Sequence, residues 1–180
     1  MKLCIVGTGY VGLVSGACFS DLGNTVFCVD KDVNKINLLN EGIIPIYEPG
    51  LDELVKKNHK QKRLIFTNNV ENAIKKSDII FICVGTPTNK KNNSANLKYV
   101  YQVSKQISKY INRYKIIVIK STVPFTTGDK IEKIIKKENN IKLFDVVSNP
   151  EFYEKAKLLE ILYIQIELLL VQTAKKPIKC

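Results

Sequence analysis

The sequence predicts an α/β fold built on a doubly wound parallel sheet of about six strands. Short apolar runs of strand length recur along the chain, and segments with helical periodicity separate them. These runs do not alternate with polar residues, which is typical of strands covered on both faces. A glycine-rich turn follows the first run directly and opens the first helical segment. Strand–helix alternation of this kind is characteristic of a parallel sheet with helices on both faces.

Each expected element has a simple signal in the sequence. The apolar runs predict strands over residues 3–6, 25–29, 64–66, 79–84, 116–119 and 144–147. Amphipathic or apolar periodic segments predict helices over residues 10–22, 33–40, 50–58, 70–75, 97–111 and 126–137. Asp32 is expected to cap the second helix, and Thr126 or Thr127 is expected to cap the last one, after Pro124.

Composition limits the function classes. The 180 residues suit about one domain of ~150 residues, and an apolar fraction of 45% excludes a disordered chain. The net charge is +11, yet Arg63 and Arg113 are the only arginines among 28 basic residues. Lysine, asparagine and isoleucine share A/T-rich codons, so base composition explains this excess. Nucleic-acid readers favour arginine, and we expect no nucleic-acid partner.

The reactive side chains do not form a metal site. The five cysteines have no C-x-x-C spacing, and four lie in apolar runs, so they are expected to be buried and reduced. His59 is the single histidine and is expected to be a solvated surface residue. No signal-peptide layout follows Met1, and the run 158–171 is too short and too polar to span a bilayer. These features predict a cytoplasmic protein without metal or membrane contact.

The glycine-rich turn reads Gly7-Thr8-Gly9-Tyr10-Val11-Gly12, a G-x-G-x-x-G motif between a strand and a helix. Gly7 permits a tight turn, Gly9 leaves room for a pyrophosphate, and Gly12 lets the helix pack closely. The helix N-terminus presents N–H groups and partial positive charge to phosphates. In this context the motif predicts a dinucleotide site, and the alternative is a glycine turn that binds no nucleotide.

Asp30 ends the second expected strand and predicts the choice of cofactor. A carboxylate there accepts hydrogen bonds from the ribose hydroxyls of NAD and repels the additional phosphate of NADP. Lys31 and Lys35 follow closely, which leaves some tolerance of NADP open.

Small and hydroxyl-bearing residues follow the later strands. They occur in the segments 85–88, 120–124 and 148–152. Ligands in such sheets lie beyond the carboxyl ends of strands, so Thr86, Ser121 and Thr122 are candidates for binding ribose, pyrophosphate or a catalytic water. Glu151 is a candidate for proton transfer. Each of these residues taken singly also suits a turn or a helix cap.

Five motifs in order resemble the NAD-binding domain of the nucleotide-sugar dehydrogenases, the UDP-glucose/GDP-mannose dehydrogenase family. They are GTGYVGLVSG at 7–16, IPIYEPGL at 44–51, VGTPT at 84–88, KSTVP at 120–124 and SNPEF at 148–152. The second motif looks more like the UDP-glucose branch than the GDP-mannose or UDP-N-acetylmannosamine branches. The resemblance covers residues 1–152, less than half of such an enzyme.

The resemblance implies oxidation of UDP-glucose to UDP-glucuronate by two hydride transfers to NAD, through a thioester on a cysteine. It implies that Thr122 and Glu151 assist the water and the proton transfers, and that Glu151 and Phe152 meet the substrate. It implies homodimers for full-length members. The residues expected to contact the cofactor are Gly7, Gly9, Tyr10, Val11, Gly12, Asp30, Lys35, Gly85, Thr86, Pro87, Ser121 and Thr122.

The resemblance breaks after Phe152. The family continues with Leu-x-Glu-Gly and a Tyr-Pro-Asp-Arg segment, where this chain reads Tyr153-Glu154-Lys155-Ala156. Read two bases later, the codons of residues 163–167 allow Tyr-Pro-Asp-Arg. We therefore expect an NAD-binding domain over residues 1–152 and a divergent, out-of-frame tail over 153–180, with coincidence as the alternative.

The family's cysteine loop, catalytic lysine and sugar-binding domain are absent from this sequence. The chain by itself is therefore expected to be inactive or very weak. The alternative function is a non-catalytic NAD-binding module, or a partner subunit of a split dehydrogenase.

Overall fold

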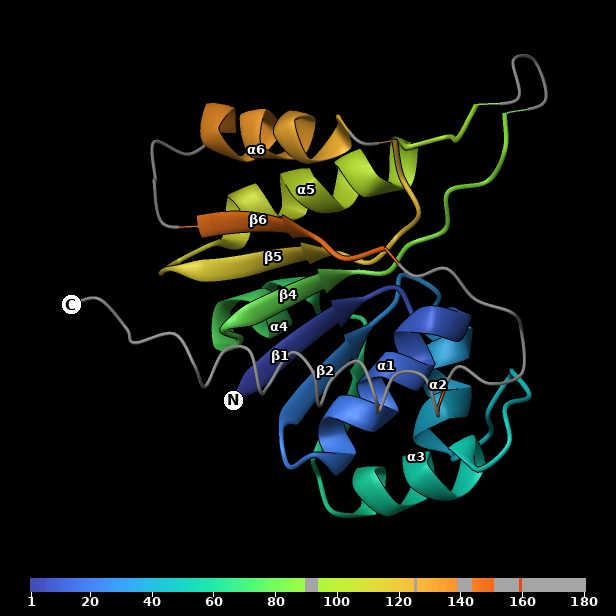
Figure 1. Cartoon of the computed structure of the whole chain (residues 1–180). Coiled ribbons are helices and arrows are strands. Elements are labelled where there is room, and N and C mark those ends of the chain that lie inside the picture. The colour runs from blue at the N-terminus through green and yellow to red at the C-terminus, as the bar shows by residue number, and fades with distance from the viewer. Residues whose placement is uncertain (90–93, 125, 139–143, 151–158, 160–180) are drawn as a thin grey trace, which may run out of the picture.

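The computed structural model describes residues 1–89, 94–124, 126–138, 144–150 and 159. Six strands form one parallel sheet in the order β3-β2-β1-β4-β5-β6 (Figure 1). The chain builds outward from β1 to β3 and then returns to place β4 on the other side of β1. The fold prediction of a doubly wound parallel sheet is therefore confirmed. The strands are β1 (Lys2–Val6), β2 (Thr25–Val29), β3 (Leu64–Thr67), β4 (Ile79–Ile82), β5 (Lys115–Ile119) and β6 (Phe144–Ser148).

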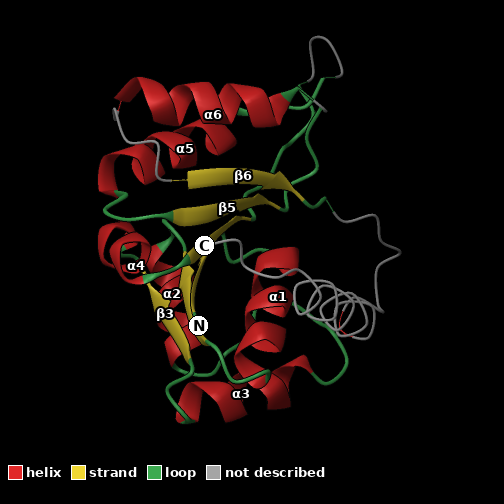
Figure 2. Ribbon diagram, turned by 60° about the vertical axis from the view of Figure 1, so that its left-hand side comes forward, coloured by secondary structure: helices red, strands yellow, loops and turns green. Residues whose placement is uncertain are grey.

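Helices lie on both faces of the sheet (Figure 2). Side chains of α1, α2 and α3 pack into a core on one face, and those of α4, α5 and α6 pack into a second core on the other. Every expected strand and helix is present, with bounds within two residues of the prediction. The helices are α1 (Tyr10–Asp21), α2 (Val33–Asn40), α3 (Leu51–Lys60), α4 (Val70–Lys76), α5 (Lys98–Tyr110) and α6 (Thr127–Glu138).

The continuous apolar runs arise because both faces of each strand are covered. Successive strand residues point to opposite faces. In β1, Leu3 and Ile5 enter the core that α1, α2 and α3 share, whereas Cys4 and Val6 enter the core that α4, α5 and α6 share. The Asp32 carboxylate accepts the N–H of Lys35 at 3.1 Å, which confirms the predicted cap of α2.

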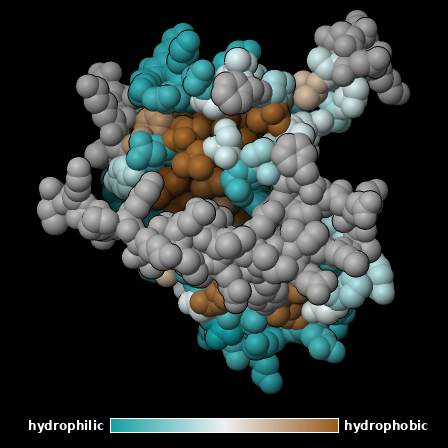
Figure 3. Space-filling model, in the orientation of Figure 1, coloured by the Kyte–Doolittle hydropathy of each residue, from teal (hydrophilic) through white to brown (hydrophobic). Residues whose placement is uncertain are grey.

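The α1 face of β4, β5 and β6 is only partly covered by the described helices. Ile79 and Ile116 are half-buried there, and Val147 is 45% exposed. Figure 3 shows the apolar surface over this part of the sheet.

The cysteine prediction is confirmed for the four described cysteines. Cys4, Cys18, Cys28 and Cys83 are buried thiols, and Cys180 lies outside the described residues. The expectation of a solvated surface histidine is met only in part. His59 is half-buried, with Nδ1 3.0 Å from the Leu64 carbonyl oxygen and its ring against Phe66.

Among the described residues there is neither a cluster suited to a metal ion nor a helix suited to a membrane. No group of three or more His, Cys, Asp or Glu side chains there is arranged to hold a metal ion. None of the helices in that part of the chain has the length and apolar character needed to cross a membrane.

Candidate functional site

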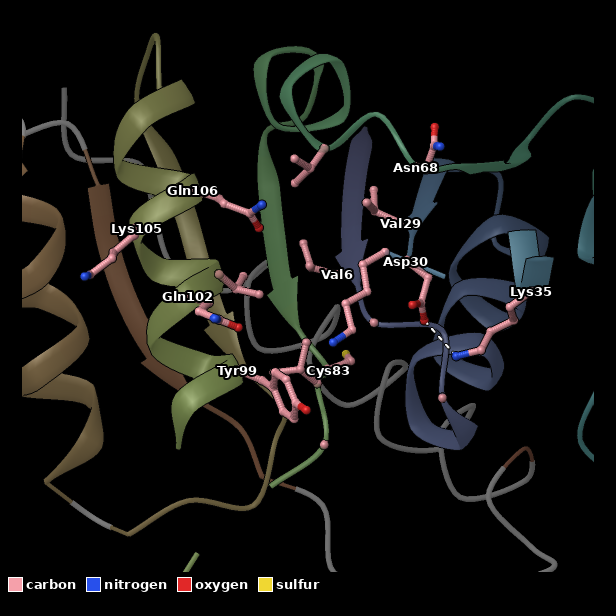
Figure 4. Close-up of a pocket in the computed structure, with 17 residues that line it drawn as sticks. Val6, Val29, Asp30, Lys35, Asn68, Cys83, Tyr99, Gln102, Lys105 and Gln106 are labelled. Carbon is pink, nitrogen blue, oxygen red and sulfur yellow. Dashed lines mark hydrogen bonds and ion pairs between the residues drawn. The ribbon is translucent and has the colours of Figure 1, made fainter. Parts of the chain in front are cut away.

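A cleft of about 710 Å³ opens at the carboxyl ends of β1, β2 and β4 (Figure 4). Its volume lies within the roughly 300–1,000 Å³ typical of ligand sites. It lies where the strand order reverses between β1 and β4, which is the position where open α/β sheets bind ligands. The glycine loop and Asp30 line one side, and α5 lines the other.

The first and last glycines of the loop are required by backbone packing. Gly7 has φ +104°, and a Cβ there would lie 2.6 Å from the Cys83 carbonyl oxygen. A Cβ at Gly12 would lie 1.9 Å from the Gly7 carbonyl oxygen. Both positions therefore exclude any side chain, which brings the start of α1 against the end of β4.

Gly9 is different, because its missing side chain leaves open space. A Cβ there would meet no atom within 4 Å, and the residue lines the cleft. Gly9 is also the N-cap of α1, so no side chain caps the helix, and its first turn carries no acid. The partial positive charge of the helix N-terminus is therefore presented beside an open backbone, an arrangement that suits a phosphate group.

Asp30 follows β2 and is hydrogen-bonded both to the glycine loop and to residues at the start of α2. Its Oδ2 accepts the backbone N–H of Thr8 at 3.0 Å and the Thr8 hydroxyl at 2.8 Å. Lys35 donates to the same oxygen at 2.9 Å. Among the described residues, the backbone N–H of Asp32 donates to Oδ1 at 3.1 Å. Oδ1 receives one of these donors and Oδ2 receives three, so Oδ1 is the oxygen with capacity for a further donor from the cleft.

The charge of Asp30 is stabilised by these donors. Burial alone would raise its pKa, but the hydrogen bonds from Lys35, Thr8 and Asp32 favour the ionised form and lower the pKa to about 2. The side chain is 12% exposed and ionised at neutral pH. It can therefore act as a fixed acceptor for hydroxyl groups.

The opposite wall of the cleft comes from α5. Tyr99, Gln102 and Gln106 project toward the strands from this helix (Figure 4), and Val103 adds an apolar surface. The Lys31 ammonium lies over the Tyr99 ring, 4.4 Å from its centroid. The sequence reasoning did not identify Tyr99, Gln102 or Thr8 as site residues. Tyr99 and Gln102 lie in an amphipathic helix that follows the fourth strand. Their place on that helix was the sequence signal that could have identified them.

The structure brings five of the expected cofactor contacts into the lining of this cleft: Gly7, Gly9, Asp30, Lys35 and Gly85. The others lie outside the lining, in the first turn of α1 and in the loops after β4 and β5. The Thr86 hydroxyl donates to the Thr122 carbonyl at 3.0 Å, which joins the loops after β4 and β5. The Ser121 hydroxyl donates to the carbonyls of Val84 at 2.7 Å and Ile82 at 3.2 Å. Pro87 and Thr122 are exposed, while Tyr10, Val11 and Gly12 form the first turn of α1.

Two further motif segments have clear contacts. Glu48, in the segment 44–51, is buried, accepts a hydrogen bond from the Tyr10 hydroxyl and accepts the Leu159 N–H at 3.1 Å. Lys120, at the end of β5, donates to Asn149 at 3.0 Å. Glu151 and Phe152, the expected proton-transfer and substrate residues, lie outside the described residues.

Comparison with known protein families shows what the chain is similar to. The profile of the UDP-glucose/GDP-mannose dehydrogenase family, NAD binding domain, matches residues 1–168. UDP-glucose 6-dehydrogenase TuaD of Bacillus subtilis is 53% identical over 152 residues, covering 84% of this chain and 33% of that protein. UDP-glucose 6-dehydrogenase of Rhizobium meliloti is 48% identical over 160 residues, covering 89% and 37%.

Solved structures show the same relationship. GDP-mannose dehydrogenase from Pseudomonas aeruginosa superposes with a TM-score of 0.84 at 36% identity, covering 89% of this chain and 38% of that one. UDP-glucose dehydrogenase from Pyrobaculum islandicum superposes with a TM-score of 0.83 at 34% identity, covering 88% and 38%. The chain spans about a third of the length of the curated relatives it matches.

Proposed function

Because the chain belongs to the UDP-glucose/GDP-mannose dehydrogenase family and carries its NAD binding domain, we propose that it binds NAD in the cleft at the sheet's switch point. In a full-length enzyme it would supply the cofactor half for oxidation of UDP-glucose to UDP-glucuronate. The observation that carries the proposal is Asp30, held ionised at the end of β2 beside the open backbone of Gly9.

The residues present fit the cofactor. Gly9 leaves space for a pyrophosphate at the start of α1, where the helix dipole stabilises negative charge. Oδ1 of Asp30 would accept a hydrogen bond from a ribose hydroxyl, and the carboxylate charge would repel a 2′-phosphate. When bound, NAD accepts a hydride from the carbon that is oxidised. This chain's contribution is to hold and orient that group against the sheet edge.

UDP-glucose as the substrate is supported by sequence relatives. Two proteins named UDP-glucose 6-dehydrogenase match this chain at 53% and 48% identity. The match to a GDP-mannose dehydrogenase structure at 36% identity is consistent with a cofactor domain shared between sugar specificities. By the family resemblance, Thr122 and Glu151 would assist the water and the proton transfers. Thr122 is exposed at the end of β5, where a substrate can reach it.

The four described cysteines are buried, which argues against a catalytic nucleophile among them. Cys4 and Cys28 are fully buried, and burial raises the pKa of each thiol well above its ordinary value. A buried thiol of this kind does not form the thiolate that attacks an aldehyde carbon. Because the chain also spans about a third of its relatives, an NAD-binding subunit that works with a separate cysteine-bearing part is the second candidate function.

Calorimetric titration of the purified chain with NAD tests the proposal. The wild type is expected to bind NAD more tightly than NADP, and Gly9→Val is expected to abolish binding because its side chain fills the space for the pyrophosphate. Gly128→Ala in α6 is the matched control, since its Cβ would make only an ordinary 3.6 Å contact with Ser148. Equal NAD binding by Gly9→Val and the wild type would refute the assignment of the loop.

An enzymatic assay tests whether the chain is active by itself. The chain alone is expected to form no UDP-glucuronate from UDP-glucose and NAD, because the thioester step needs an accessible thiolate and the described cysteines are buried. Conversion by the pure chain would show that a complete active site is present.

We further propose that the domain ends near residue 152 and that residues 153–180 are translated out of frame. The family profile matches residues 1–168 and so extends past this boundary. The proposal therefore concerns the reading frame of the gene, which the sequence of the DNA decides. Resequencing from the codon of Pro150 tests it. A one-base slip near the codon of Phe152, followed in the restored frame by a glycine-rich segment with a cysteine, would support it, and a continuous frame would exclude it.

A further inference from the structure

The cleft is bridged near Asp30 by a contact between its two walls. Lys31 follows β2, and Tyr99 lies in the first turn of α5, yet the Lys31 ammonium is 4.4 Å from the centroid of the Tyr99 ring. Both residues line the cleft. Tyr99 is 37% exposed, so its ring is accessible from the cleft. Among the described residues that line the cleft, Tyr99 is the one aromatic side chain.

We propose that the Tyr99 ring is the stacking surface for the adenine base, and that Lys31 competes with adenine for that ring. This inference rests on the proposed function, since it concerns the adenosine half of NAD. The ammonium and the base would use the same aromatic face, so one must leave when the other binds. Lys31 would thus lower the affinity for the base, and Tyr99 would raise it.

The position of Asp30 determines which part of the dinucleotide reaches Tyr99. The carboxylate at the end of β2 binds the hydroxyls of the adenosine ribose in this fold. Adenine is attached to that ribose, and Lys31, the next residue after Asp30, already reaches the Tyr99 ring. A base that extends from a ribose held at Asp30 therefore lies between the end of β2 and α5. Figure 4 shows Asp30 and Tyr99 on opposite sides of this space.

The chemistry of the surrounding side chains suits a purine. Val29 and Val103 provide apolar contacts, and the amides of Gln102 and Gln106 offer both donors and acceptors to the edge of a base. Stacking of a base on an aromatic side chain contributes on the order of five- to hundredfold in affinity. An exposed cation–π contact contributes only about two- to fivefold. Adenine is thus expected to displace Lys31 rather than to be excluded by it.

Adenosine is the probe for the experiment, because it is uncharged and its binding does not depend on the general attraction of lysines for phosphate. Tyr99→Ala is expected to weaken binding of adenosine and of NAD roughly tenfold, whereas Tyr99→Phe retains wild-type affinity. Lys31→Met is expected to tighten adenosine binding about two- to fivefold, and to have no effect in the Tyr99→Ala background. Tyr114→Ala and Lys133→Met, outside the cleft lining, are the aromatic and charge controls.

A measurement on the wild type avoids dependence on folded variants. In an NMR titration with adenosine, the ring protons of Tyr99 are expected to shift upfield, and those of Tyr114 to stay in place. Failure of the wild type to bind NAD would refute the proposed function. Binding of NAD by the wild type, with an unchanged Tyr99 resonance and equal adenosine affinity in Tyr99→Ala, would overturn only the present inference. Weaker adenosine binding by Lys31→Met would overturn the competition.

Discussion

The carboxylate of Asp30 accepts both the backbone N–H and the hydroxyl of Thr8, at 3.0 and 2.8 Å on a single oxygen. Thr8 lies between the first two glycines of the motif and is 1% exposed. The residue proposed to discriminate between NAD and NADP is therefore held by the loop proposed to bind the pyrophosphate. The two parts of the site form one hydrogen-bonded unit, although 22 positions separate them in the sequence.

Substitution of Thr8 is expected to disturb both parts. Thr8→Val keeps the shape of the side chain but removes its donor to a charged acceptor, which costs about 1–2 kcal/mol of unfolding free energy. It should also raise the pKa of Asp30, because the ionised form loses a hydrogen bond. Urea unfolding measures the loss of stability, and an NMR pH titration of the Asp30 carboxyl carbon measures its pKa. Thr25→Val, at a half-buried strand position, is the control and should change stability by less than about 0.5 kcal/mol.

The low pKa of Asp30 predicts an acid dependence of stability. Its ordinary value of 3.8 applies to the unfolded chain, and its folded value is about 2. The folded state thus favours the ionised form, and this stabilisation is complete above about pH 4 and is lost as the pH falls toward 2. It amounts to at most about 2 kcal/mol. The difference in unfolding free energy between the wild type and Asp30→Asn should shrink over this range, and a constant difference would contradict the assignment.

Substitution by alanine is expected to destabilise the fold strongly at Gly12 and only slightly at Gly9. A methyl group at Gly12 would overlap the Gly7 carbonyl oxygen at 1.9 Å, so Gly12→Ala should destabilise the fold by roughly 3 kcal/mol. A methyl group at Gly9 meets no atom within 4 Å, so Gly9→Ala should change stability by less than about 1 kcal/mol. Thermal unfolding of both variants checks this contrast. Similar losses in the two variants would show that the backbone at Gly9 is also constrained.

The contact between Tyr10 and Glu48 predicts coupling between the first turn of α1 and the segment 44–51. Tyr10→Phe leaves the buried carboxylate without the phenol donor and should cost about 1–2 kcal/mol. Glu48→Gln keeps an acceptor and should cost less than Glu48→Ala. The Tyr10→Phe/Glu48→Ala double variant should lose less than the sum of the single losses. Additive losses in urea unfolding would show that the two side chains do not interact.

The order of strands and helices could be predicted because each element has its own local signal. The runs 25–29 and 33–40 coincide with β2 and α2, because strand periodicity and the cap residue Asp32 act within a few positions. The exposure of His59 could not be predicted in this way. Its half-buried position depends on Leu64 and Phe66 in the following strand, which α3 packs against.

The candidate site was predictable only where it has a sequence motif. Gly7, Gly9 and Asp30 belong to a pattern whose spacing follows from one strand, one turn and one helix, and all three line the cleft. Tyr99 has no such pattern, because it comes from a helix that the sheet brings to the cleft from 69 positions beyond Asp30. The placement of Glu151 and Phe152 stays a prediction, as does the catalytic role of Thr122.

The sequence by itself determined the parallel sheet, the glycine loop, the acid after the second strand and the family resemblance, because these depend on periodicity and short-range spacing. Only the tertiary structure decided that Thr8 and Lys35 together hold Asp30 ionised, that Glu48 contacts Tyr10, and that Lys31 meets Tyr99 across the cleft. These contacts join segments that meet only when strand order places them at one edge of the sheet. A hydrogen bond or a ring contact depends on distances of a few ångströms, which spacing along a chain does not specify.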